Sequence, residues 1–195
     1  MQDGTAAVMQ KYNFSAIHQR LLLRNVVFLH KNKDMTNNGI NNNEEGKRDS
    51  QQKKDEQFMR KALAEAEAAK EAGEIPIGAV IVCKDRIISR AHNLTETLCD
   101  VTAHAEMQAI TAAENFMGGK YLTDCTLYVT VEPCPMCAGA IGWAQIKRIV
   151  YGAPDDKRGF HIYAPKAIHP KAEVKAGVLE DECRTMMQEF FKGKR

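Results

Sequence analysis

From residue 56 onward, apolar residues recur first at the spacing of a helix and then at the spacing of strands. Within residues 56–73 they form one helical face: Phe58, Ala62, Ala66 and Ala69. Gly73 is placed to end this helix. In residues 75–93 two β-rich runs flank Lys84–Asp85, which predicts two strands joined by a tight turn.

The rest of the chain alternates between these two patterns. Strands are predicted at 125–131, 146–153 and 172–178, and helices at 102–116, 135–145 and 179–192. Residues 153–171 are loop-rich, with room for one helical turn. Such alternation of strands and helices predicts one mixed sheet with helices on both faces.

The N-terminal third has no comparable pattern. Residues 34–56 are rich in Asn, Gln and charge and nearly lack apolar side chains, so we expect them to be disordered. The sequence thus predicts an N-terminal extension, residues 1–54, before a folded domain, residues 55–195. Three interpretations of the extension stay open: a short amphipathic helix around Ile17–Leu29, a sequence upstream of a true start at Met35, or an organelle transit peptide.

Composition places the chain among soluble globular proteins, with 44% hydrophobic and 27% charged residues. Six scattered cysteines do not resemble a secreted disulfide framework, so we expect a reducing, cytoplasmic location. The apolar run at 21–30 is too short to span a bilayer, and no membrane partner is expected. The net charge of +2 divides into +4 in residues 1–54 and −2 in 55–195, so nucleic acid would have to bind through local basic clusters.

Candidate chemistry lies where predicted strands give way to helices. Cys134 and Cys137 open one helix, and His104 opens another, with Glu106 two residues later. One imidazole and two thiolates suit a catalytic zinc ion, which keeps its fourth position for water. Glu106 would then be a proton shuttle beside that water rather than a ligand.

Each residue alone also has a simpler interpretation. C-x-x-C after a strand also fits a redox pair or two buried thiols, a lone histidine is often a core residue, and a lone glutamate is usually solvated. The combination of H-x-E with P-C-x-x-C about thirty residues later is much more specific, and it is the signature of the zinc nucleobase and nucleoside deaminases.

The resemblance extends beyond this signature. The segments "EIPIGAVIV", "AHN", "TAHAEMQAI", "TLYVTVEPC" and "MCAGAI", with a final "VLEDEC", resemble the bacterial tRNA-specific adenosine deaminases (the TadA family) in the same order. It covers residues 55–195. Two differences are "CDVTAHAE", where family members often have "HDPTAHAE", and a bulkier loop at 157–164. In that loop Phe160, His161 and Tyr163 would either stack on bases or fill space.

The resemblance implies a cytidine-deaminase-like three-layer α/β/α sandwich with a mixed five-stranded sheet. It implies one zinc per subunit, held by His104, Cys134 and Cys137, with Glu106 as the catalytic residue and Asn93 binding the substrate base. The implied activity is deamination of adenosine to inosine at the wobble position of a tRNA anticodon stem-loop, by a homodimer. A free guanine or cytosine deaminase is the alternative enzyme. A non-catalytic zinc-stapled binding module is a third interpretation, which leaves Glu106 without a role.

Overall fold

The computed structural model describes residues 40–193, whose elements follow the order that the sequence predicts. The helices are α2 (Ile40–Glu71), α3 (Ala105–Met117), α4 (Pro135–Trp143), the short α5 (Phe160–Tyr163) and α6 (Glu180–Lys192). The strands are β1 (Gly78–Cys83), β2 (Arg86–His92), β3 (Cys125–Val131), β4 (Arg148–Ala153) and β5 (Glu173–Lys175).

The strands form one mixed sheet in the order β2-β1-β3-β4-β5. Strand β1 is antiparallel to both β2 and β3, whereas β3, β4 and β5 run parallel to one another. The tight turn predicted at Lys84–Asp85 is confirmed, since both residues have positive φ, as a two-residue hairpin requires. Because β1 opposes both of its neighbours, β2 and β3 end at the same edge of the sheet.

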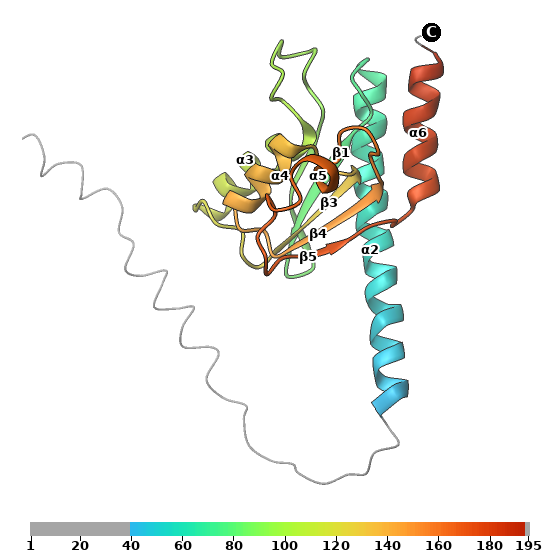
Figure 1. The fold of residues 1–195 in the computed structure, drawn as a ribbon, viewed down its shortest axis with the longest axis vertical. Coiled ribbons are helices and arrows are strands. Elements are labelled where there is room, and N and C mark those ends of the chain that lie inside the picture. The colour runs from blue at the N-terminus through green and yellow to red at the C-terminus, as the bar shows by residue number, and fades with distance from the viewer. Residues whose placement is uncertain (1–39, 194–195) are drawn as a thin grey trace, which may run out of the picture. The chain divides into compact units, whose positions relative to one another are not determined.

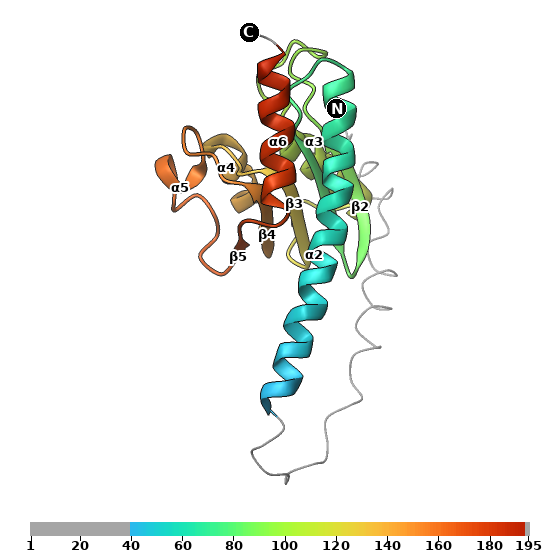
Figure 2. The same ribbon diagram turned by 90° about the vertical axis from the view of Figure 1, so that its right-hand side faces the viewer.

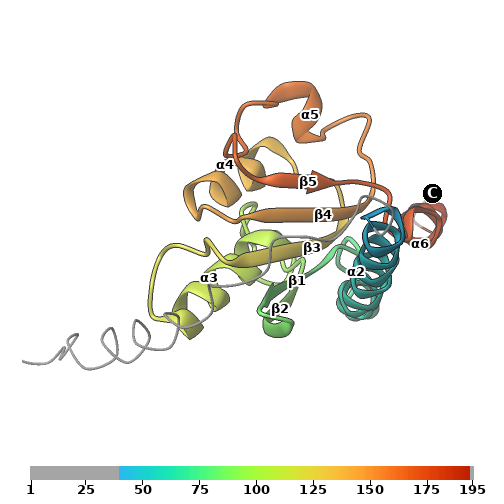
Figure 3. The ribbon, with the colours of Figure 1, turned by 90° about the horizontal axis from the view of Figure 1, so that it is seen from below.

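Helices cover both faces of the sheet, which confirms the predicted three-layer sandwich (Figures 1 and 2). Seen from below, α3 and α4 lie on one side of the strands and α2 and α6 on the other (Figure 3). Alternate residues of the central strands face opposite layers. Ile81 and Leu127 pack with α3 and α4, while Val80 and Tyr128 pack with α2.

Helix α2 ends where the pattern predicts but begins earlier. The apolar face predicted at 56–73 is buried, and Gly73, at φ +81°, terminates the helix. The expected disorder over residues 34–56 is wrong for residues 40–56, which are helical. Polar side chains one turn apart support this segment, with Gln51 Nε2 donating to Asp55 Oδ1 over 3.0 Å and Lys53 Nζ lying 2.7 Å from Asp49 Oδ2.

The segment 51–55 is also attached to the sheet by hydrogen bonds and ion pairs. Lys175 Nζ donates to Gln52 Oε1 over 2.6 Å, and Lys54 Nζ lies 2.7 Å from Asp85 Oδ2. A prediction based on apolar burial overlooks such polar contacts. Residues 1–39, with the possible helix at Ile17–Leu29 and the possible start at Met35, lie outside the described residues, and the division at residue 55 stays a prediction.

Asp55 makes the largest set of these contacts between α2 and the sheet. Its carboxylate is fully buried and accepts hydrogen bonds from two Arg148 nitrogens at 2.7 and 3.0 Å. Lys175 Nζ donates over 2.9 Å and the Tyr128 hydroxyl over 3.0 Å. One side chain of α2 thereby contacts β3, β4 and β5.

Candidate metal centre and active site

Two helices begin at the edge of the sheet where β2 and β3 end. His104 is the residue immediately before α3, and Cys134 is the residue immediately before α4, with Pro135 in the first turn. Both cap residues have extended backbone conformations. Thr102 lies two residues before the His104 cap, and its hydroxyl donates to Asp100 Oδ1 over 2.7 Å.

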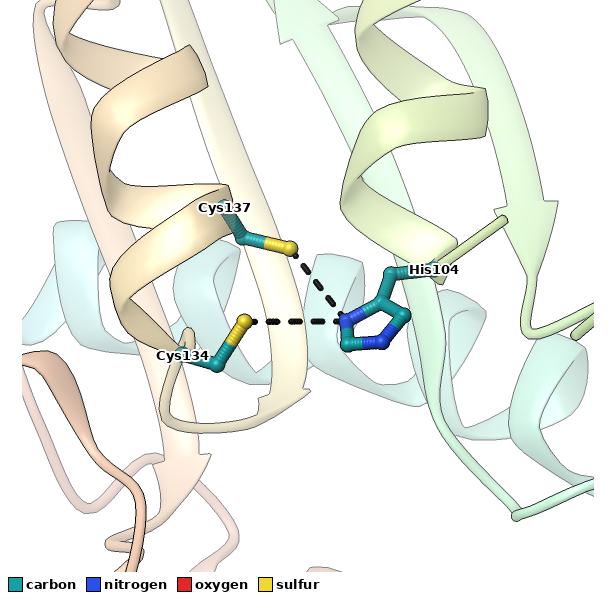
Figure 4. A group of neighbouring side chains, drawn as sticks. All are labelled: His104, Cys134 and Cys137. Carbon is teal, nitrogen blue, oxygen red and sulfur yellow. Dashed lines mark hydrogen bonds between the residues drawn. The ribbon is translucent and has the colours of Figure 1, made fainter. Parts of the chain in front are cut away.

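This arrangement brings the three predicted ligands together (Figure 4). The Nδ1 atom of His104 lies 3.7 Å from Cys134 Sγ and 3.5 Å from Cys137 Sγ. All three ligand atoms lie within 4.8 Å of one another.

The spacing fits zinc. Zn–S bonds of 2.3 Å and Zn–N bonds of 2.0–2.1 Å in a tetrahedron place sulfur and nitrogen about 3.6 Å apart. The two observed S–N separations, 3.5 and 3.7 Å, bracket that value. A His/Cys/Cys set is also the donor chemistry of catalytic zinc with one open position, so the residues present fit the ion.

The hydrogen bond between the two thiols favours ionisation of Cys134 over Cys137. A hydrogen bond from Cys137, with a further one from His104, lowers the pKa of the Cys134 thiol to about 4. The same bond, together with burial, raises the pKa of Cys137. The Cys134 thiolate in turn raises the pKa of His104. A site with one preformed thiolate is prepared for a cation, and metal binding releases the remaining proton.

Glu106 lies on the first turn of α3 and is almost completely buried. Burial raises the pKa of its carboxyl to about 7. A cation bound by His104, Cys134 and Cys137 would lower this pKa toward its ordinary range. A carboxyl whose charge depends on its neighbours in this way is suited to accept and return a proton.

Asn93 follows β2 directly and is buried. The N–H of Leu94 donates to the carbonyl oxygen of Ala103 over 3.0 Å, so Asn93 lies near the start of α3. Its Nδ2 donates to Glu74 Oε2 over 3.0 Å and to Thr95 Oγ1 over 2.8 Å. The structure therefore places Asn93 beside the His104 segment, and its role in base binding stays a prediction.

Glu74 is a site residue that the sequence analysis missed. Its fully buried carboxylate accepts the backbone N–H of Thr97 over 2.7 Å and that of Glu96 over 3.2 Å, in addition to Asn93. Burial alone would raise its pKa, but these hydrogen bonds outweigh burial and lower it. Glu74 therefore fixes the loop between β2 and His104. In the sequence, Glu74 could have been noticed as the charged residue inside the otherwise apolar segment "GEIPIGAVIV".

The aromatic loop at 157–164 divides between the two roles that the sequence left open. Phe160 is buried and packs edge-on against Tyr151, with ring centroids 6.5 Å apart, so it fills space. His161 and Tyr163 are exposed. Stacking on bases is open to these two residues and not to Phe160.

Comparison with known proteins gives a consistent picture. The family model for the cytidine and deoxycytidylate deaminase zinc-binding region matches residues 52–153, which include all five predicted site residues. A tRNA-specific adenosine deaminase of Bacillus subtilis is 46% identical over 143 residues, covering 71% of this chain and 89% of that protein. Its counterpart from Agrobacterium fabrum is 43% identical over 143 residues, covering 71% and 94%. A solved structure from work on A-to-I editing by tRNA:A34 deaminases superposes with a TM-score of 0.63 at 43% identity, covering 67% and 98%. The predicted cytidine-deaminase-like fold is confirmed.

Proposed function

The chain belongs to the cytidine and deoxycytidylate deaminase zinc-binding family, and we propose that it converts adenosine to inosine at the wobble position of a tRNA anticodon. The observation that carries the proposal is the extent of the match to the Bacillus subtilis tRNA-specific adenosine deaminase. At 46% identity it covers 89% of that protein and so includes the parts outside the shared zinc motif.

His104, Cys134 and Cys137 would hold one zinc ion per subunit, since their ligand atoms lie within 4.8 Å of one another. When bound, zinc is a Lewis acid that makes water a nucleophile at neutral pH. The starts of α3 and α4, where these ligands lie, add positive potential, which favours the thiolate form of the two cysteines.

Glu106 moves the protons. Its carboxylate takes one proton from the attacking water and gives it to N1 of adenine. It then carries the second proton to the C6 amino group, which leaves as ammonia, so that adenosine and water become inosine and ammonia. Asn93, held by Glu74, positions the base during these steps.

The protein acts as a homodimer in this proposal. Helices α3 and α4 carry large apolar side chains that face solvent in the single chain, among them Phe116, Met136 and Trp143, of which Trp143 is 84% exposed. Exposed apolar surface of this kind is typical of an interface. No helix within residues 40–193 has the length and apolar character needed to cross a bilayer. A cytoplasmic location is consistent with two ligand thiols that must stay reduced.

An inosine assay on a panel of tRNAs tests the activity, with free guanine, cytosine, adenosine and cytidine measured in parallel. We expect inosine in the anticodon of at least one tRNA and little turnover of the free compounds. Efficient deamination of guanine or cytosine, with no inosine in any tRNA, would establish the alternative free-base activity instead.

A further inference from the structure

Glu132 is a further buried carboxylate near the candidate metal centre, two residues before Cys134. Its side chain has no solvent exposure. Oε2 accepts the backbone N–H of Asp155 over 3.1 Å, and Oε1 accepts the backbone N–H of His161, also over 3.1 Å. The imidazole of His161 adds a third contact, with Nδ1 only 2.6 Å from Oε1. Both ends of the loop 155–161 are thus attached to one carboxylate.

This loop is held close to the ligand segment by further contacts. The N–H of Phe160 donates to the carbonyl oxygen of Pro133, the residue before Cys134, over 2.9 Å. A side-chain carbon on Gly159 would lie 2.5 Å from the Glu132 carboxylate, so only glycine permits this approach. The views in Figures 1 and 3 agree in placing α5, which contains His161, next to α4.

The contact with Glu132 also determines the chemistry of the His161 ring. A carboxylate only accepts hydrogen bonds, so in the neutral ring Nδ1 carries the hydrogen and Nε2 has the free lone pair. The side chain is 49% exposed, and Nδ1 is the ring nitrogen that faces the buried carboxylate. No group within residues 40–193 forms a hydrogen bond to Nε2.

We propose that His161 Nε2 accepts a hydrogen bond from the 2′-hydroxyl of a ribose in the bound anticodon loop, and that Glu132 is the positioning residue for this contact. An acceptor needs a donor. Phosphate and ring oxygens of an RNA backbone only accept, so the 2′-hydroxyl is the one donor that the backbone supplies. The contact therefore selects ribonucleotides over deoxyribonucleotides. This inference rests on the proposed tRNA deaminase function.

The test compares an all-ribose anticodon stem-loop with a set in which each loop nucleotide in turn is 2′-deoxy. Inosine formation is measured as kcat/KM for the wild type, for His161→Phe, which keeps a ring but has no acceptor, and for His161→Ala. The matched control is His169→Phe, because His169 is exposed in the same loop-rich region and its contact is to the backbone of Lys171.

For the wild type we expect one deoxy position to lower kcat/KM about 3- to 10-fold, the value of one hydrogen bond. His161→Phe and His161→Ala should lower kcat/KM for the all-ribose stem-loop by a similar factor, with no further loss when the sensitive nucleotide is 2′-deoxy. His169→Phe should show the same loss as the wild type on that deoxy substrate. General damage to the loop would lower kcat/KM for the all-ribose and the 2′-deoxy stem-loops equally, so the ratio between these two substrates would stay at its wild-type value.

Two results would overturn the inference alone: a wild type indifferent to every deoxy substitution, or a penalty that persists in both His161 variants. A wild type that forms no inosine in any RNA would refute the proposed function itself, and this inference with it.

Discussion

Replacing Asp55 with Asn tests whether the buried ion pair between Asp55 and Arg148 stabilises the packing of α2 on the sheet. The substitution keeps the size of the side chain and removes its charge. It places an amide NH₂ where the carboxylate now accepts hydrogen bonds from Arg148, Lys175 and Tyr128. The Arg148 side chain, which is only 12% exposed, would lose its buried counter-charge.

The magnitude follows from the pKa of Asp55. Burial raises this pKa, but hydrogen bonds from Arg148, Lys175 and Gln51 outweigh burial and lower it from 3.8 to about 2. At about 1.4 kcal/mol per pKa unit, ionisation of Asp55 contributes about 2 kcal/mol to the free energy of unfolding at neutral pH. The amide donors at position 55 add a further cost, so we expect a loss of about 3–5 kcal/mol.

Urea unfolding followed by circular dichroism measures this loss at pH 7. The control is Asp49→Asn on the same helix, whose ion pair with Lys53 is exposed at both side chains and should contribute little to stability, because solvent screens it. Because the pKa of Asp55 is lowered in the folded state, the ionic contribution is complete above about pH 5. This contribution disappears as the pH falls from about 4 to 2, so the difference in unfolding free energy between wild type and Asp55→Asn should shrink there by about 2 kcal/mol, to the cost of the amide donors. A loss below about 1 kcal/mol, or one equal to that of Asp49→Asn, would refute the assigned role.

Three further predictions concern the active site. Glu106→Gln should keep its zinc, measured by metal analysis, and lose at least 10²–10⁴-fold in the rate of inosine formation, because the amide cannot accept a proton. Near-normal turnover would mean that another residue is the base, and loss of zinc would mean that Glu106 is a ligand. Cys137→Ser should lose zinc and have a lower melting temperature, since metal affinity is coupled to folding. Cys183 is also buried, and Cys183→Ser is the control that should keep stoichiometric zinc, whereas a Cys137→Ser protein with full zinc would exclude this ligand set. The rate of inosine formation in tRNA should fall steeply from low to moderate salt, because protein contacts to phosphates release counterions. Lys157 and Arg158, exposed in the loop that Glu132 anchors, could make such contacts. A salt-independent rate would favour a small free substrate.

The element order could be predicted because each element has a local cause. The helical face of Phe58, Ala62, Ala66 and Ala69 and the β-rich run of β3 are patterns of neighbouring residues, and the structure buries both. The start of α2 could not be predicted in this way. Its residues 40–56 lack an apolar face, and their tertiary contacts come from Asp85, Arg148 and Lys175, which are remote in the sequence.

The candidate ligands could be proposed from the sequence because metal chemistry restricts residue types. Few side chains bind zinc, and their spacing around helix starts is a local property of the chain, so His104, Cys134 and Cys137 were recognisable before their 3.5 and 3.7 Å separations were known. The helix starts meet only because β1 is antiparallel to both β2 and β3. That pairing depends on the whole sheet, and the spacing of the motif does not contain it.

The buried carboxylates explain why the surroundings of the site were harder to predict than its centre. Glu74 and Glu132 accept backbone N–H groups, of Thr97 and Asp155 among others, and every residue except proline can supply such a donor. No residue type at the partner position therefore reveals the contact. Yet these two residues fix the loops on either side of the metal ligands, one with Asn93 and the other with His161. The zinc motif determines which reaction the site can perform. The two loop anchors hold Asn93 and His161, so variants at these positions would test substrate preference.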